Sequence, residues 1–390
     1  MTSCNQSATG SCSAAEGFQT RAVGDASHAE GSNTLAEGAA SHAEGFQTNP
    51  RGVASHTEGS NTVAIGTASH AEGFLTSASD DTAHAEGNIT EAAGFASHAE
   101  GILTRATASS AHAEGNSTLA GGNSSHAEGA NTVAMNLYAH AEGHVTLASA
   151  IASHAEGENT VASGLVSHAE GQSTQAQGES SHAEGDQTTA SGRASHAEGN
   201  LTVASGIFAH AEGQRTIALG DLSHAEGNQT QALGQNAHAE GALNVASGFT
   251  SHAEGVNTVA SGFFSHTEGQ STDANFLEGV HVMGQFGAAN ELSYSWYLAN
   301  GTDASTPGLA AKILSNGNVK IDGTVSSPAA DYAELFETTD GNPIEFGYFA
   351  RWKTIKSELQ VAMMTIYWES QAQSRLSCPI AASCDGSTST

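Results

Sequence analysis

Small and polar positions alternate along most of the chain, in a pattern that repeats every 14 residues. Its most constant part is Ser-His-Ala-Glu-Gly, first seen at residues 27–31, and its histidine recurs 18 times between His28 and His266. A Thr-x-Ala stretch, in most copies followed by x-Gly, comes after each copy, as at residues 34–38, with Pro50 and Asn244 as the exceptions to its Ala and Thr. Alternation with period 2, interrupted by short links, predicts two strands and two turns in each 14-residue coil. A fixed short period maintained over residues 13–275 predicts a solenoid.

Alternation also sorts the side chains into two faces. Ser27, Ala29 and Gly31 are expected to point inward, opposite Thr34 and the small residues that follow it, because a flattened coil of two strands leaves little room inside. Such small residues exclude a coiled coil, which needs Leu or Ile at the repeated positions. The outward pair on the second strand varies freely between copies, as a solvent face does. The constant outward His/Glu pair on the first strand predicts contact with a partner that also repeats, most simply another copy of the chain.

The repeats resemble the head repeats of trimeric autotransporter adhesins, in which a Ser-x-Ala-x-Gly strand recurs every 14 residues. The stretch Asn-Thr-Val-Ala-Ile-Gly at residues 61–66 is close to that family's usual repeat, and the resemblance covers roughly residues 13–275. It implies an all-β fold: a left-handed parallel β-roll solenoid of 14-residue coils that forms a homotrimer around a common axis. The chain departs from the family where His and Glu replace the outward aliphatic pair on one strand.

Four segments follow from where the pattern starts and stops. We expect a flexible lead over residues 1–12, a β-roll of about 19 coils over 13–275, a small β collar over 276–325, and a divergent segment over 326–390. Irregular coils are expected near Pro50, Asp80 and Asn136, and Pro50 also removes a ladder donor. In the collar, residues 312–321 predict a hairpin around an Asn-Gly turn at 316–317.

Charge and composition narrow the class of protein. The formal net charge is −30 and no lysine precedes Lys312, which argues against nucleic acid and anionic membranes as partners. Residues 1–6 do not read as a signal peptide, and no run of 18 apolar residues predicts membrane insertion. The expected location is an extracellular, virion, cell-surface or spore-surface appendage. The cysteines, which lack C-x-x-C spacing, are expected to be free thiols, with interchain disulfides as the alternative: Cys4, Cys12, Cys378 and Cys384.

Stacked coils would place the constant outward residues in two columns with a spacing of about 4.8 Å. We call these columns the His/Glu ladder. We expect it to act as a polar zipper that fixes register and trimer state, since carboxylates buried at an axis need partners. The alternative is a metal column in which three imidazoles from three chains hold Zn²⁺ or Ni²⁺; no other cofactor is expected. Catalysis by the ladder is disfavoured, because no nucleophile accompanies its many identical sites. The first members are His28, His42, His56, His70, His84 and His98, with Glu30, Glu44, Glu58, Glu72, Glu86 and Glu100.

The stretch Ala-Asp-Tyr-Ala-Glu at residues 330–334 resembles part of the intramolecular-chaperone domain of bacteriophage neck-appendage and tail-spike proteins, a self-cleaving peptidase family of the glutamic type. The resemblance runs from about 276 to 348. It implies that Asp331 and Glu334 form the acid pair for a single cut near residues 326–328, after the domain has aided trimer assembly. Past Tyr348 the likeness ends, and a shifted reading frame or a truncation is our hypothesis for the tail.

Three functions are therefore carried forward. The preferred one is a non-enzymatic structural fibre, a trimeric rod of an extracellular, phage-derived or cell-surface appendage. The alternative is an adhesin whose variable faces bind a receptor or glycan. Such a site should show clustered exposed aromatic residues, which the roll is expected to lack. The third is a peptidase that cleaves only its own chain at the C-terminal segment. The sequence leaves open whether rods also join end to end.

Overall fold

The computed structural model describes residues 5–324, 349–353 and 363–367. It divides into two units, residues 1–323 and 324–390. In the second unit, β44 (Phe349–Lys353) and β45 (Met363–Tyr367) form an antiparallel pair. Within the described ranges, no helix is long and apolar enough to cross a membrane.

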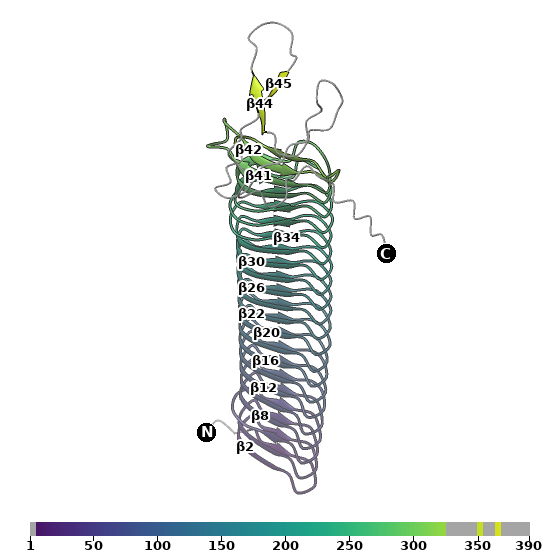
Figure 1. Ribbon diagram of the computed structural model, residues 1–390. Helices are drawn as coiled ribbons and strands as arrows, with labels where there is room; N and C mark the ends of the chain where they lie inside the picture. The colour runs from purple at the N-terminus through teal and green to yellow at the C-terminus, as the bar shows by residue number, and fades with distance from the viewer. Residues whose placement is uncertain (1–4, 325–348, 354–362, 368–390) are drawn as a thin grey trace, which may run out of the picture. The chain divides into compact units, whose positions relative to one another are not determined.

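The first unit is a parallel β-solenoid of about 21 turns with 14-residue coils, and the predicted all-β solenoid is confirmed (Figure 1). The long strand of a coil has five residues, as in β2 (Ala14–Phe18) and β4 (His28–Ser32), and recurs every 14 residues from β8 (His56–Ser60) to β32 (His224–Asn228). The short strand has two residues, from β3 (Arg21–Ala22) through β5 (Leu35–Ala36) to β37 (Val259–Ala260). In four coils the long strand shortens to two residues: β6 (His42–Ala43), β34 (His238–Ala239), β36 (His252–Ala253) and β38 (His266–Thr267).

The interior of the solenoid holds only small side chains, as predicted. Ala29 and Ala36 are fully buried, and Ser27 and Thr34 are at most 2% exposed. The Ser27 hydroxyl donates to the Gly24 carbonyl oxygen at 2.6 Å, which closes the turn before the long strand. Each coil therefore buries alanine methyl groups and small hydroxyl side chains instead of a large apolar core.

Gly31 does not lie on the inward face, contrary to the prediction. It is exposed, and its φ of 105° lies in a region that side chains rarely adopt. A Cβ built at Gly31 would lie 2.1 Å from the carbonyl oxygen of Gly45 in the next coil. The glycine at this position is thus required by close backbone contact between coils and not by a narrow interior.

A left-handed residue occurs every seventh position, at both corners of each coil, and was not predicted. At Asn33 the φ is 60°, and its N–H donates to the Phe18 carbonyl oxygen of the preceding coil at 2.9 Å. Ala26 at the other corner donates in the same way to Ser11, at 2.7 Å. Even the β-branched residues Ile89 and Val145 adopt this conformation, which is normally unfavourable for them. The hydrogen bonds between coils therefore impose the corner geometry over local preference.

Pro50 interrupts the ladder of short strands, as predicted. β7 (Asn49–Pro50) pairs with β9 (Val63–Ala64) of the following coil, whereas β5 belongs to a separate sheet with β1 and β3. Proline has no N–H to offer the Leu35 carbonyl oxygen. With its amide nitrogen turned toward that oxygen, Asn49 donates to it at 2.9 Å. The side chain of Asn49 thus replaces the hydrogen bond that Pro50 removes.

The irregularity expected near Asp80 and Asn136 is not present. The neighbouring short strands β11 (Ser77–Ala78) and β19 (Val133–Ala134) keep the regular pairing. Asp80 and Asn136 occupy a corner position at which φ is not positive. The left-handed residues of these corners are Thr82 and Tyr138 instead.

Parallel stacking extends beyond the 14-residue period at both ends. β1 (Ser7–Ala8) pairs with β3, so the predicted flexible lead already joins the stack at residue 7. At the other end, β39 (Gln270–Asp273) and β38 pair with β40 (His281–Ala288), and β40 pairs with β41 (Trp296–Asn300), with spacings of 15 residues. Then β42 (Leu309–Ile313) and β43 (Val319–Ile321) add antiparallel strands around the predicted Asn-Gly turn, which is confirmed. A small core that includes Val280, Val282 and Tyr297 fills this collar.

Enlarging an interior side chain should destabilise the solenoid. We expect Ala169→Leu, at a fully buried position of β24 (His168–Gln172), to cost about 1–3 kcal/mol in the free energy of unfolding through overpacking. The control Ser163→Leu lies at an exposed position where the equivalent residue of another coil is Leu219, and should be close to neutral. Thermal and denaturant unfolding of the two variants checks this. Equal stability of the two would contradict the tight interior.

The role of the Asn49 side chain, which replaces the hydrogen bond removed by Pro50, can be tested by a double-mutant cycle. Asn49→Val should destabilise the native protein by about 0.5–1.5 kcal/mol, since it removes the only hydrogen bond that we assign to the Leu35 carbonyl. In a Pro50→Ala background, which restores a backbone donor, the same change should cost much less. Amide hydrogen exchange of the first three coils provides the readout. An identical cost in both backgrounds would show that Asn49 does not perform this role.

Candidate functional site

The His/Glu ladder is formed by the long strands. His154 and Glu156 lie two residues apart on β22 (His154–Glu158) and so project from the same face of the strand. In-register parallel pairing places each histidine directly over the next, with ring centroids 4.6 Å apart and an interplanar angle of 3° between His154 and His168. Every coil repeats this arrangement, which produces one continuous column of stacked imidazoles beside one column of carboxylates.

The imidazole column is longer than the sequence period indicated. His281 stacks on His266 at 4.5 Å, although 15 residues separate them instead of 14. The ladder therefore contains nineteen histidines, and His281 was missed because a one-residue insertion breaks the period. Trp296 lies over His281 with centroids 4.8 Å apart and a 55° angle between the rings. This indole ends the column.

Each Nε2 atom faces the carboxylate column but few reach hydrogen-bond distance. The Nε2 of His154 lies 3.5 Å from Oε2 of Glu156 on the same strand. From His224 onward the partner is the glutamate of the preceding coil, and His252 and His266 approach theirs to 3.2 and 3.3 Å. Elsewhere along the column the Nε2 atoms are buried and lack a hydrogen-bond partner, while the side chains as a whole remain about one-third exposed. The ladder is thus a half-exposed polar strip with unsatisfied nitrogen atoms.

Burial lowers the pKa of many ladder histidines, and the like charge of the neighbouring imidazoles lowers it further. The nearby glutamates act in the opposite direction but do not outweigh these two effects. Neutral imidazole is therefore favoured near neutral pH, and within one chain the ladder is not a column of ion pairs. The histidines so affected are His42, His70, His84, His98, His154, His168, His196, His224, His238 and His266.

Neighbouring carboxyl groups of the carboxylate column shift one another's pKa. Hydrogen bonding to Glu212, burial and nearby carboxylates raise the pKa of Glu198 to about 7, and the same causes raise the pKa of Glu226 to about 7. The pKa of Glu212, between them, is lowered because it accepts hydrogen bonds from both. Burial and hydrogen bonding also raise the pKa of Glu170, and hydrogen bonding lowers that of Glu184. In this region, raised and lowered carboxyl pKa values alternate from coil to coil.

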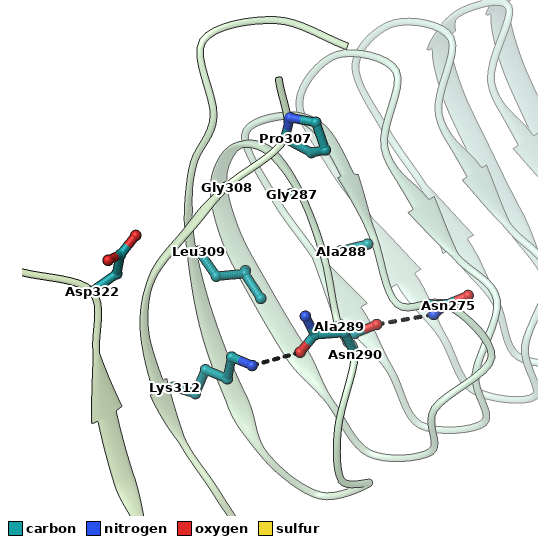
Figure 2. A pocket seen from close by; sticks show the side chains of 10 residues that line it. All are labelled: Asn275, Gly287, Ala288, Ala289, Asn290, Pro307, Gly308, Leu309, Lys312 and Asp322. Atoms are coloured by element: carbon teal, nitrogen blue, oxygen red, sulfur yellow. Dashed lines mark hydrogen bonds between the residues drawn. The ribbon is translucent and has the colours of Figure 1, made fainter. Parts of the chain in front are cut away.

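A second polar feature is a hollow of about 410 Å³ in the collar (Figure 2). The Nζ atom of Lys312 donates to Oδ1 of Asn290 at 2.7 Å, and Nδ2 of Asn275 donates to the Ala289 carbonyl oxygen at 3.1 Å. Its polar groups thus hold the collar strands together. Ten residues line it: Asn275, Gly287, Ala288, Ala289, Asn290, Pro307, Gly308, Leu309, Lys312 and Asp322.

The expectation that the roll lacks clustered exposed aromatic residues is wrong. Phe18, Phe46 and Phe74 lie two coils apart in one column, and each is 45% exposed. At the other corner, near the C-terminal end, Phe249 contacts both Phe263 and Phe264 edge to face. Stacking of the coils brings together residues that are 14 or 28 positions apart in the sequence, and for this reason the sequence analysis missed these clusters. Both corners of the solenoid thus expose apolar surface.

Several predicted residues cannot be placed. Asp331 and Glu334 lie outside the described residues, as do Cys4, Cys378 and Cys384, so autoproteolysis at residues 326–328 remains a prediction. Cys12 is described, and it is an exposed free thiol.

Comparison with known families agrees with the geometry of the coils. The family model of the YadA head domain repeat matches residues 52–73, 169–195, 197–223 and 245–265, all within the solenoid. The matched coils are similar to adhesin-type head repeats. Each matched segment contains at least one His-x-Glu-Gly stretch, so the ladder runs through the segments that carry this similarity. No curated protein matches the chain.

The raised carboxyl pKa values in the carboxylate column predict how the stability of the fold changes with pH. Because the pKa of Glu226 is raised in the folded state from 4.5 to about 7, its contribution to stability is complete below pH 4.5 and is lost as the pH rises through 7. Glu226→Gln keeps a neutral side chain at every pH, and should therefore lose less stability than the native protein between pH 5 and 8. Thermal unfolding across this range measures it. The control Glu158→Gln removes an exposed carboxylate outside the column and should leave the slope unchanged.

Proposed function

We propose that the chain forms an adhesin-like surface fibre, in which three copies associate through their His/Glu ladders. The observation that carries this proposal is the ladder within a solenoid of adhesin-type head repeats. Every coil from His28 to Glu268 presents the same outward pair on the long strand, whereas the outward residues of the short strand change from copy to copy. A surface that stays constant over so many coils is explained by a partner with the same 14-residue period.

The chemistry of the ladder supports self-association. One chain leaves a strip of imidazoles and carboxylates half-exposed, with buried Nε2 atoms that lack partners. Carboxylates or protonated carboxyl groups from neighbouring copies supply acceptors and donors at the same spacing, since all copies share one coil height. Neutral imidazoles and carboxyl groups with raised pKa values also reduce the charge that such an interface would bury. The ladder would then fix the register of the three chains as well as their number.

The exposed corners support an adhesive role over a purely structural rod. The column of Phe18, Phe46 and Phe74 and the cluster around Phe264 present apolar surface at opposite ends of the solenoid. Exposed apolar patches of this kind mark interaction surfaces more often than inert ones. A phage-derived structural rod is the second candidate. Its support is the C-terminal resemblance around Asp331 and Glu334, which lie outside the described residues.

Absolute mass in solution tests the association and its face. The native protein should have three times the chain mass of 39.4 kDa by light scattering. Substituting three ladder histidines with lysine (His140→Lys, His154→Lys and His168→Lys) should give monomers, because the stacked imidazoles are lost and desolvation of the added ammonium groups at the interface costs several kcal/mol.

The matched control places three lysines on the short strands of the neighbouring coils, with Val161→Lys, Gln175→Lys and Thr189→Lys. These substitutions should leave the trimer intact, since the outward positions of the short strand are expected to face solvent. A native monomer would overturn the trimer. Dissociation by the control set and not by the ladder set would move the interface to the short strands.

A further inference from the structure

The ladder also brings together a set of metal-ligating atoms within each single chain. One ring nitrogen of His154, one of His168 and a carboxylate oxygen of Glu156 all lie within 4.8 Å of one another. The same trio recurs at other gaps between coils, including those of His112/Glu114/His126, His140/Glu142/His154, His168/Glu170/His182 and His182/Glu184/His196. Two imidazole nitrogens and one carboxylate oxygen form a donor set typical of Zn²⁺.

The nitrogen atoms in these gaps have no other role in the chain. The Nε2 atoms of His154 and His168 are buried and make no hydrogen bond, although the Glu156 carboxylate lies nearby. A buried nitrogen without a partner is costly, and a cation shared with the carboxylate would satisfy two of them at once. This orphaned pair, and not the acidic column alone, points to a cation.

Stacking sets a geometric condition on such a site. Parallel rings 4.6 Å apart hold their Nε2 atoms at a similar separation with parallel lone pairs. Two Zn–N bonds of about 2.0–2.1 Å span at most about 4.2 Å, and less in tetrahedral geometry. The two rings must therefore turn toward each other to bind one ion. Their side chains are about one-third exposed, so the interior packing does not prevent this rotation.

We propose that the ladder binds zinc-class divalent cations at alternate gaps, each ion held by two histidines of successive coils and the glutamate between them in one chain. A histidine that turns into one gap withdraws its Nε2 from the next gap, so adjacent gaps compete. Nineteen ladder histidines therefore provide at most nine such sites. The last gap, between His281 and Trp296, lacks a second ligand and ends the series. This proposal concerns single chains and does not depend on the trimer.

Stoichiometry distinguishes this cross-coil site from a metal held by three imidazoles of three chains. Full-length protein, stripped with chelator and dialysed against excess Zn²⁺, should retain close to nine ions per chain by elemental analysis. One ion per layer of three histidines would give about six. Retention of no more than one ion per chain after removal of free zinc would overturn the proposal.

Two variants with equal numbers of substitutions sharpen the test. The alternate variant changes nine histidines to glutamine at every second coil, so that no two ladder histidines remain adjacent: His42, His70, His98, His126, His154, His182, His210, His238 and His266. The block variant changes nine successive ones: His28, His42, His56, His70, His84, His98, His112, His126 and His140. Cross-coil pairing predicts that the alternate variant loses its zinc, while the block variant keeps about five ions per chain. Equal retention by both would exclude pairing between coils.

Folding of both variants is checked by their circular dichroism and thermal unfolding. X-ray absorption at the zinc edge of the native protein gives an independent readout that needs no variant. Two imidazole ligands per ion agree with the proposal, and three imidazoles would assign the metal to an interchain layer instead.

Discussion

In-register stacking of short parallel strands is the constraint on which the rest of the structure depends. Each coil gains its hydrogen bonds from the coils above and below, so its backbone must repeat with little change. Two strands so close together leave space only for Ala, Ser and Thr between them. A solenoid with this interior gains little from large apolar side chains, and its stability comes mainly from backbone pairing between neighbouring coils.

The exceptions in the repeat show how this constraint is met when the residue type changes. Asn244 replaces the usual buried threonine, and its amide donates to the Gly255 carbonyl oxygen at 2.7 Å while accepting from the Thr258 N–H at 2.7 Å. Asn49 compensates for Pro50 by a similar use of its amide. Both exceptions keep the coil height by supplying a hydrogen bond from a side chain. Backbone continuity is thus preserved in preference to side-chain identity.

In-register stacking also makes identical side chains of successive coils neighbours, and this determines the electrostatics of the ladder. Histidines stack on histidines and glutamates approach glutamates, so each column faces its own charge. Neutral imidazole is therefore favoured on one side, and on the other the pKa of Glu198 and Glu226 is raised to about 7. A column of this kind is sensitive to anything that adds or removes positive charge, whether protons, a cation or a second copy of the chain.

The sequence by itself determined the coil, because a 14-residue period of small and polar residues has few other physical solutions. It predicted the strands, the inward Ala and Thr columns, the ladder spacing and the interruption at Pro50. It did not reveal the left-handed corners, since residues as different as Asn33 and Ile89 adopt the same conformation under the hydrogen bonds of the neighbouring coil.

Only the tertiary structure decided the features that depend on neighbours in the stack. His281 joins the ladder across a 15-residue spacing, Trp296 ends it, and Phe18, Phe46 and Phe74 form one exposed column. Likewise, the neutral state favoured for the imidazoles and the alternately raised and lowered pKa values of the glutamates follow from burial and from distances of a few ångströms between coils. Linear sequence carries neither quantity, because both arise when residues far apart in the chain are brought to the same face.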